Sequence, residues 1–339
     1  MRKSFRRVSL FLMAALVLAA PALAADVDRT GWPDQLRFMA GPPGGNWFAL
    51  GTALAEMWTA SGLPQTTSSS GGGVSNIVNA NDRKGDLGFS VTSMVGAATQ
   101  EGGVGFTKGQ KMENAVLMAN LYTQYTYFIA RKDWAEANGI GSVEDMIAKR
   151  PPVRFATLKP ATSSEFVVRA LFEKGYGLDY KKAIEEWGGT VEHASYEGGA
   201  DLLADGHLDC FAFSVGKIAS IVMNIESKVD VVLLPVGQEA LDELAAAYGT
   251  ATFTVEPGIY KAVPEGAEPV KVVGDYTCIV VRKDLPESLV HELNRAIWEN
   301  RDALTAAVKD VQELDPATAT SETVPTHAGS LSYWKSVAQ

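Results

Sequence analysis

The chain has 339 residues, of which 46% are hydrophobic and 21% charged, with 30 Lys and Arg against 40 Asp and Glu. This is the composition of one large or two medium globular domains and not of a disordered chain. Two cysteines, Cys210 and Cys278, are too few for a disulfide scaffold or a cysteine-based zinc site. The net charge of −10 argues against nucleic acid as a partner. A single long apolar run, at the start, excludes a polytopic membrane protein.

The N-terminus has the features of an export signal. Residues 2–7 read RKSFRR, an apolar run follows, and the run ends in Ala22-Leu23-Ala24, the small-x-small pattern that signal peptidase accepts. An uncleaved membrane anchor is the alternative, but the run is short for a span and is broken by Pro21. Cleavage after Ala24 leaves 26 basic against 40 acidic residues, a net charge of −14. We therefore expect a protein that works in the periplasm.

This export signal makes a first testable prediction. The intact mass of protein recovered from the periplasm is expected to correspond to a chain that begins at Ala25. Mass spectrometry of the periplasmic fraction checks it, with the unprocessed chain as the reference. A full-length, membrane-retained species as the main product would contradict the prediction.

Strand and helix patterns alternate along the rest of the chain. Short apolar runs predict strands, and apolar residues at helical spacing predict the helices between them. In chain order we expect a strand at 36–40, a helix over 47–58, strands at 86–90, 115–121 and 153–158, a helix through 166–171, strands at 208–213 and 229–234, and a long helix over 286–308. This alternation predicts an α/β fold with mainly parallel sheet. Both cysteines lie in strand-like runs, which favours two buried thiols, although a disulfide between them stays possible.

Two segments far apart in the chain resemble each other. Residues 125–133 read YTYFIARKD, and residues 276–284 read YTCIVVRKD. Two similar strands that far apart suit a chain that leaves one domain, builds a second and returns. We therefore expect a discontinuous first domain, residues 25–125 with 282–339, and a second domain, residues 126–281, that includes the crossing strands. Chance similarity between two ordinary strands, with solvated Arg-Lys-Asp ends, is the alternative.

Two polar turns in the first domain could hold a ligand. Residues 41–51 read GPPGGNWFALG, which places Asn46 where a helix N-cap would be, followed by Trp47 and Phe48. Residues 66–76 read TTSSSGGGVSN, in which the hydroxyl of Ser70, the N–H of Gly71 and the amide of Asn76 could donate hydrogen bonds to an anion. Neither turn has a nucleotide-binding spacing. A tight turn and a flexible linker are the respective structural alternatives.

Two more polar turns lie in the second domain. Residues 157–165 read TLKPATSSE, and Thr162 or Ser163 is the expected N-cap of the next helix. Residues 213–217 read FSVGK, in which Lys217 could pair with a carboxylate or face water. Ligands of open α/β sheets bind at the carboxyl ends of strands, where these turns are expected to lie. The aromatic residues near the four turns are Trp47, Phe48, Tyr122, Tyr125, Phe213 and Tyr260.

No pattern in the chain predicts catalysis. The four histidines form no zinc motif, and Ser214 lies in FSVGK instead of a nucleophile elbow. No set of residues defines a nucleophile, a base and an orienting group. We therefore expect a binding protein without catalytic residues, metal or cofactor. A secreted α/β enzyme remains the less favoured alternative.

Several longer motifs carry a family resemblance. They are GGNWFALG, SSSGGGVSNI followed by GDLGFSVTSMVGAA, LLADGHLDCFAFSVGKI, VVLLPV, YTCIVVRKDLPESLVHELNRAIWEN and HAGSLSYW. In this order they resemble the TAXI family, the solute-binding subunits of a class of TRAP (tripartite ATP-independent periplasmic) transporters. The resemblance covers nearly all of the chain after the export signal.

This resemblance implies a fold and a function. The fold is a two-lobed, type II-like periplasmic-binding-protein clamshell with two crossing hinge strands. The function is capture of a small carboxylate such as glutamate or 2-oxoglutarate and its delivery to TRAP-type membrane permease subunits. An ATP-driven importer with the same fold is the alternative.

The resemblance also implies site residues, by position. They are Asn46, Trp47, Phe48, Ser70, Gly72, Asn76, Ser90, Thr92, Thr162, Ser163 and Ser164. The chain departs from the family at two places in the expected pocket: Trp47-Phe48 stands where aromatic pairs such as Tyr-Tyr are common, and Lys217 stands where a proline is usual. Phe213, Lys217 and Tyr260 complete the predicted ligand-binding set.

Overall fold

The computed structural model describes residues 27–41, 43, 46–103, 105–106 and 110–338. The predicted export signal, residues 1–24, and the glycines at 44 and 45 of the first turn lie outside these residues. Within them, no helix combines the length and apolar character that crossing a membrane requires.

Strands and helices alternate over most of the chain. Their order is β1 Gln35–Met39, α1 Asn46–Ala60, β2 Gln65–Ser69, α2 Gly73–Asn81, β3 Leu87–Val91, α3 Thr92–Ala98, β4 Ala115–Arg131, α4 Lys132–Asn138, α5 Val143–Lys149, β5 Arg154–Thr157, α6 Ser163–Ala170, the π-helical turn η1 Leu171–Gly175, α7 Tyr180–Glu186, β6 Thr190–His193, α8 Tyr196–Ala204, β7 Cys210–Val215, α9 Ser220–Lys228, β8 Val231–Leu233, α10 Gln238–Tyr248, β9 Ala251–Val255, β10 Val270–Arg282, α11 Glu287–Glu299, α12 Arg301–Ala307, the 3₁₀ turn η2 Lys309–Glu313 and α13 Ala328–Val337.

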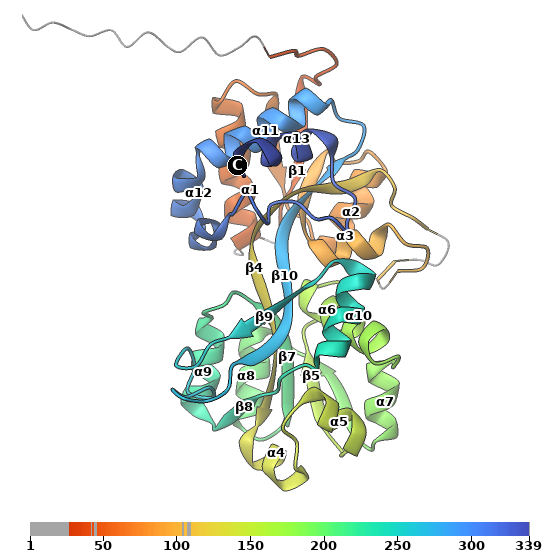
Figure 1. The fold of residues 1–339 in the computed structure, drawn as a ribbon, viewed down its shortest axis with the longest axis vertical. Coiled ribbons are helices and arrows are strands. Elements are labelled where there is room, and N and C mark those ends of the chain that lie inside the picture. Colours follow the sequence, from red (N-terminus) through yellow and green to blue (C-terminus); the bar gives the residue numbers. More distant parts are fainter. Residues whose placement is uncertain (1–26, 42, 44–45, 104, 107–109, 339) are drawn as a thin grey trace, which may run out of the picture.

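The molecule has two lobes joined by two long strands (Figure 1). We call the part with β1–β3, α1–α3 and α11–α13 the upper lobe, and the part with β5–β9 and α4–α10 the lower lobe. The strands β4 and β10 run side by side through both. This is the α/β, two-lobed architecture with crossing strands that the sequence predicts.

The two halves of the sheet have equivalent strand orders when each is followed inward from its own edge. The whole order runs β2-β1-β3-β10-β4-β7-β5-β6, so β1, β2 and β3 occupy the places that β5, β6 and β7 occupy in the other lobe. Pairs within a lobe are parallel, as in β1 with β2 and β5 with β6. Every antiparallel pair involves β4 or β10. Each lobe is therefore a parallel sheet completed by the two crossing strands.

The two similar segments of the sequence start at the same level of this ladder. Tyr125 lies opposite Gly274, and Tyr276 lies opposite Thr123. Because the strands are antiparallel, one segment runs into the lower lobe and the other into the upper lobe. Their ends also match: Arg131 binds Asp133 at 2.7 Å, and Arg282 binds Asp284 at 2.9 Å.

A buried aspartate repeats this correspondence between the lobes. Asp86 accepts from the backbone N–H and the guanidinium of Arg37, and Asp209 accepts from the same two groups of Arg154. The matching contacts indicate that the two lobes use one local design twice. The domain boundaries at 125 and 282 stay a prediction.

The lobes share part of their hydrophobic core. One cluster, around Leu54, Phe89 and Leu293, belongs to the upper lobe, and another, around Phe211 and Val222, to the lower lobe. A third cluster is continuous from Met94 of α3 to Phe166 of α6 and Tyr248 of α10. Burial of apolar surface thus fixes the lobes against each other along α3.

The structure corrects three details of the predicted elements. Residues 65–69 form the edge strand β2 instead of a loop, because they pair with β1 although only Thr66 among them is buried. The long helix predicted over 286–308 is divided at Asn300, whose side chain bonds the carbonyl of Ala296 at 2.9 Å. Asn46 is the first helical residue and not the N-cap, a shift of one position.

The two cysteines are free and buried, as their strand context predicts. Cys210 lies on β7 and Cys278 on β10, both with fully buried side chains. Burial raises the pKa of both thiols, which keeps them protonated and unreactive. They act as small apolar core residues.

Candidate functional site

Six strand–helix turns open toward the space between the lobes. The strand β4 descends from the upper to the lower lobe, and β10 ascends against it. Because β3 is antiparallel to β10, the carboxyl ends of β1, β2 and β3 point down. Because β7 is antiparallel to β4, those of β5, β6 and β7 point up. The turns that follow these strands therefore face each other, at the edge where α/β sheets bind ligands.

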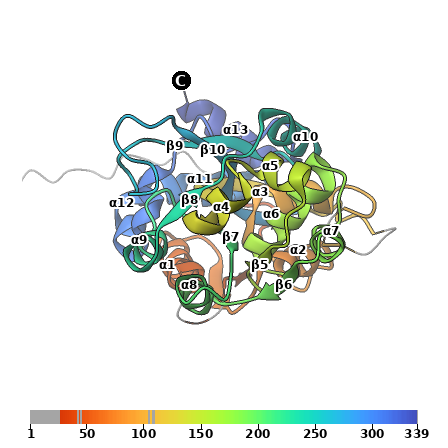
Figure 2. The same ribbon diagram turned by 90° about the horizontal axis from the view of Figure 1, so that it is seen from below.

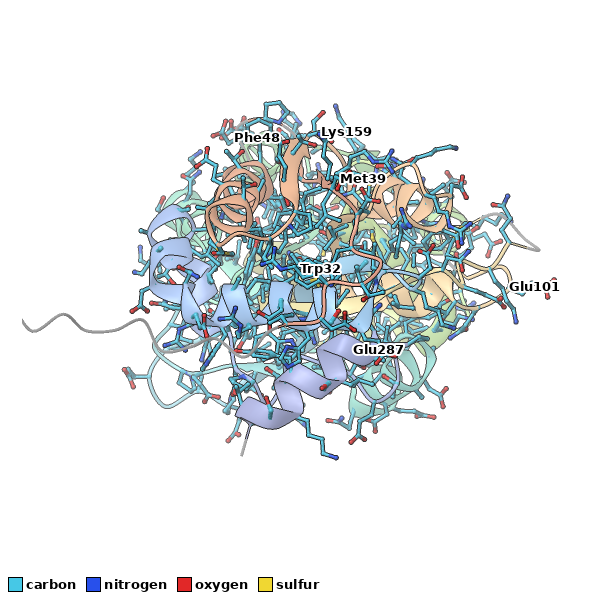
Figure 3. All side chains as sticks on the ribbon, turned by 90° about the horizontal axis from the view of Figure 1, so that it is seen from above. Trp32, Met39, Phe48, Glu101, Lys159 and Glu287 are labelled. Atoms are coloured by element: carbon cyan, nitrogen blue, oxygen red, sulfur yellow. The ribbon has the colours of Figure 1, made fainter. Side chains whose placement is uncertain are left out.

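Three of the turns lie on one side of the molecule. Seen from below, α1 and α2 of the upper lobe lie on the same side as α8 and β6 of the lower lobe (Figure 2). The side chains of Phe48 and Lys159, one from each lobe, also lie on one side when the molecule is seen from above (Figure 3). The continuous core along α3 and α10 lies away from this side, so the turns before α1, α2 and α8 lie on the accessible side of the boundary.

Trp47 connects the first turn to the crossing strands. Its indole Nε1 donates to Thr277 Oγ1 at 3.3 Å, and Gln124 Nε2 donates to the same oxygen at 2.7 Å. Tyr122, which is 5% exposed, hydrogen-bonds to both Thr277 and Trp47 through its hydroxyl, and burial raises its pKa. The network ties α1 to the centre of the hinge. Asn46 is exposed and Phe48 is half-buried beside it.

From the sequence we expect Asn76 to offer its amide to a ligand, but the structure uses this amide inside the upper lobe. Its side chain is fully buried, and Nδ2 lies 2.8–2.9 Å from the carbonyl oxygens of Met39, Ala40 and Phe89. Its Oδ1 accepts from the backbone N–H of Gly72 at 3.1 Å. Asn76 therefore positions the ends of β1 and β3 and the start of α2, and it acts on the site only through them.

The turn before α2 is short and exposed. Ser70 is exposed, and no described hydrogen bond uses its hydroxyl. A side chain at Gly71 would collide with the amide of Asn76, which explains the glycine there. Gly72 is the extended residue before the helix and has no side-chain cap. The hydroxyl of Ser70 and the first N–H groups of α2 are the donors that this turn presents.

Ser90 and Thr92 lie at the end of β3 and are buried. Thr92 Oγ1 donates to Asn120 Oδ1 at 2.5 Å, and Ser90 Oγ donates to the carbonyl of Gly73 at 3.4 Å. The predicted positions are correct for the strand end, but both hydroxyls are used within the upper lobe. They hold α2 and β4 against β3.

The turn before α6 matches the predicted pattern. Thr162 is the N-cap, and its Oγ1 accepts from the N–H of Glu165 at 3.3 Å. Ser163 is half-buried and no described hydrogen bond uses its hydroxyl. Ser164 is buried, and its Oγ accepts from the N–H of Ser214 at 2.9 Å, which ties α6 to β7. Ser163 is therefore the hydroxyl that this turn presents.

Tyr196 is a residue that the sequence analysis missed. It is the first residue of α8, it is 36% exposed, and its hydroxyl donates to the carbonyl of Ser214 at 2.9 Å. Its ring packs edge-on against Phe213, whose own side chain is fully buried. The signal in the sequence is weak, because Ser195 caps a helix that follows only a short, half-exposed strand.

Lys217 lies in a turn that two phenols hold in place. The hydroxyls of Tyr127 and Tyr260 donate to its carbonyl at 2.9 and 3.0 Å, and the oxygen of Tyr260 accepts from Ala219 N–H. Tyr260 is buried, so it supports the turn and does not line the space between the lobes. The half-buried Lys217 side chain takes part in no described ion pair.

The two most distinct cavities of the described chain lie away from the six turns. These two cavities, of about 850 and 650 Å³, lie on the upper lobe beside residues 316–328. They are lined by none of the predicted site residues. Among the described residues, no cluster of three His, Cys, Asp or Glu side chains could hold a metal ion.

Solved structures resemble this chain at low sequence identity, and one of them, with a TM-score above 0.5, shares its fold. XAC2383 from Xanthomonas citri, bound to chloride ion, is 10% identical with a TM-score of 0.51, and the match covers 90% of this chain and 96% of that one. A TctC solute binding protein from Polaromonas is 17% identical with a TM-score of 0.49, over 85% and 90%. MatC from Rhodopseudomonas palustris, with bound malate, is 17% identical with a TM-score of 0.46, over 91% and 100%.

A family model gives the more specific assignment. The model of the NMT1-like family matches residues 38–337, which include both lobes, both crossing strands and all six turns. The chain therefore belongs to the NMT1-like family.

Proposed function

We propose that this protein is a periplasmic solute-binding protein that captures a small organic carboxylate between its lobes. Glutamate and 2-oxoglutarate are the solutes that its motifs favour. It then delivers the solute to the membrane subunits of a TRAP-type permease. The delivery step rests on the order of the TAXI-like motifs along the chain, and periplasmic location rests on the export signal.

The observation that carries the proposal is the convergence of six helix-opening turns. The helices α1, α2, α6, α8 and α9 and the start of α3 each follow one of the six strand ends. Unpaired N–H groups and the positive end of the helix dipole favour an anion at these starts, except at α3, where the carboxylate of Asp275 already accepts from the N–H of Ser93. Each end contributes about 0.3–1 kcal/mol. A hydrogen bond to a charged group adds about 1.5–3 kcal/mol. A few such contacts supply the roughly 8 kcal/mol of a micromolar complex.

Two serines, one in each lobe, are the side-chain donors that we place against the solute. Ser70 and Ser163 both follow a strand end, and no described hydrogen bond uses either hydroxyl. The overall charge of the mature chain opposes an anion, but salt screens that field beyond about 8–10 Å. The hydrogen-bond donors within the site therefore decide whether an anion binds. Asn46, Trp47, Thr162, Ser164 and Lys217 complete the proposed surroundings.

Calorimetry of the mature protein with a panel of carboxylates and their neutral analogues tests the proposal. At least one carboxylate is expected to bind, and Ser70→Ala and Ser163→Ala are each expected to weaken it about tenfold, the loss of one hydrogen bond to a charged group. Ser61→Ala and Ser227→Ala, at exposed serines near the ends of α1 and α9, are the controls and leave affinity unchanged. Tight binding of a neutral or cationic solute, with no carboxylate bound, would refute the proposal.

A further inference from the structure

Asp310 is a carboxylate that the proposed function does not use. It belongs to η2 of the upper lobe and is half-buried. Its Oδ2 lies 3.9 Å from the position that a Cβ would take on Gly216, in the turn after β7 of the lower lobe. The carboxylate thus faces the opposite lobe across the space between them.

The charge of Asp310 has no partner among the described residues. No described hydrogen bond or ion pair involves its side chain, and burial, followed by the charge of Glu313, raises its pKa. Lys309, its chain neighbour, is the cation that acts on it, and Lys309 is exposed. A partly desolvated carboxylate without a partner is unfavourable, and further closure of the lobes would make it more so.

Its neighbour Glu313 has a different environment. The carboxylate of Glu313 accepts from the backbone N–H of Thr123 at 2.9 Å and from the hydroxyl of the same residue. Glu313 is therefore satisfied within the upper lobe and serves to hold η2 against β4. Of the two carboxylates, Asp310 and Glu313, only that of Asp310 therefore remains available to a group outside the protein.

The charge of Asp310 acts on one buried hydroxyl that is able to donate. The buried Tyr122, whose pKa the charge of Asp310 also raises, receives hydrogen bonds from Thr277 and Trp47 on its hydroxyl oxygen. No described acceptor takes the proton of Tyr122. Gly216, which the carboxylate of Asp310 faces, belongs to the turn after β7, so Asp310 lies beside one of the six turns of the proposed anion site.

We propose that Asp310 binds a positively charged amino group of the solute, so that the solute is a zwitterionic amino acid. The inference rests on the proposed function, because the carboxylate of the same solute would lie at the helix starts. An ammonium group donates up to three hydrogen bonds and neutralises the carboxylate as the lobes close. The Lys217 ammonium, next in the chain to Gly216, is the competing partner, and no described ion pair joins it to Asp310.

Calorimetry with matched pairs of acids tests the inference. Each pair shares one carbon skeleton and differs in the amino group: glutamate and 2-oxoglutarate, alanine and pyruvate, leucine and 4-methyl-2-oxopentanoate. The wild-type protein is expected to bind the amino member of one pair at least tenfold tighter. Asp310→Asn is expected to remove that preference by weakening the amino member tenfold or more, ~1.4 kcal/mol, while the oxo member changes less than twofold.

The control variant removes an equal charge from the same lobe. Asp302→Asn, at a fully exposed residue of α12, is expected to change neither member. Thermal melting of each variant confirms that it is folded. A wild-type preference for the oxo acids, or equal weakening of both members by Asp310→Asn, overturns the amino-group inference and leaves the carboxylate proposal intact. If no acid of any pair binds, both proposals fail.

Discussion

Replacing Asn76 with alanine is expected to lower the free energy of unfolding by about 4 kcal/mol. The amide is fully buried and bonds the carbonyls of Met39, Ala40 and Phe89 and the N–H of Gly72. Each buried backbone group that loses its partner costs about 1–3 kcal/mol. Urea unfolding followed by circular dichroism measures the change. Solute binding should weaken as well, because the same groups hold the turns after β1 and before α2.

The exposed Ser75 on the same helix provides the control. Its hydroxyl bonds only the carbonyl of Gly72, so Ser75→Ala should change stability by about 0.5 kcal/mol or less. Asn76→Asp should be at least as damaging as alanine, because it sets a second acceptor oxygen against three carbonyl oxygens. A loss below about 1 kcal/mol for both Asn76 variants would show that these bonds contribute little to the fold.

The stability of the protein is expected to contain a component from Asp275 that decreases as pH rises from 4 to 7. Asp275 lies on β10, is 1% exposed, and accepts from the backbone N–H and hydroxyl of Ser93 and from the N–H of Tyr276. Burial outweighs these bonds and raises its pKa from 3.8 to about 6. The folded state therefore binds this proton more tightly than the unfolded state does.

Proton linkage gives the direction and the size of this pH-dependent change in stability. A raised carboxyl pKa contributes stability that is fully present below about pH 4 and is lost as pH rises through about 6. A pKa raised by about two units corresponds to about 3 kcal/mol of folding free energy. Asp275→Asn cannot titrate, so its stability relative to the wild type should increase by that amount between pH 4 and pH 7. Urea unfolding of both proteins at several pH values measures the difference.

The exposed Asp302 again serves as the control, because Asp302→Asn should keep a constant difference from the wild type over the same range. A constant difference for Asp275→Asn as well, or one that changes in the opposite direction, would contradict the assignment of the raised pKa. The result also concerns the hinge, because Asp275 ties the start of α3 to a crossing strand.

Local patterns in the sequence determine the elements and their order. Apolar periodicity predicts β1, α1, β5, β7 and α11, because a half-buried strand or helix must repeat its apolar residues at its own spacing. The cap at Thr162 is equally local, since its hydroxyl reaches a backbone N–H three residues on. The two similar segments at 125–133 and 276–284 go further, because they mark the crossing strands and so indicate two lobes.

Contacts between distant residues decide the site, and local patterns do not contain them. The polar segment 65–69 is a strand only because β1 pairs with it, and Asn76 turns inward only because three carbonyls from β1 and β3 meet there. Asp310 faces the lower lobe because η2 returns to the hinge after α12. Sequence by itself thus determined which segments carry polar turns. The tertiary structure alone decided which side chains are used up inside each lobe and which remain for a solute, because hydrogen-bond partners far apart in the chain meet only in the folded state.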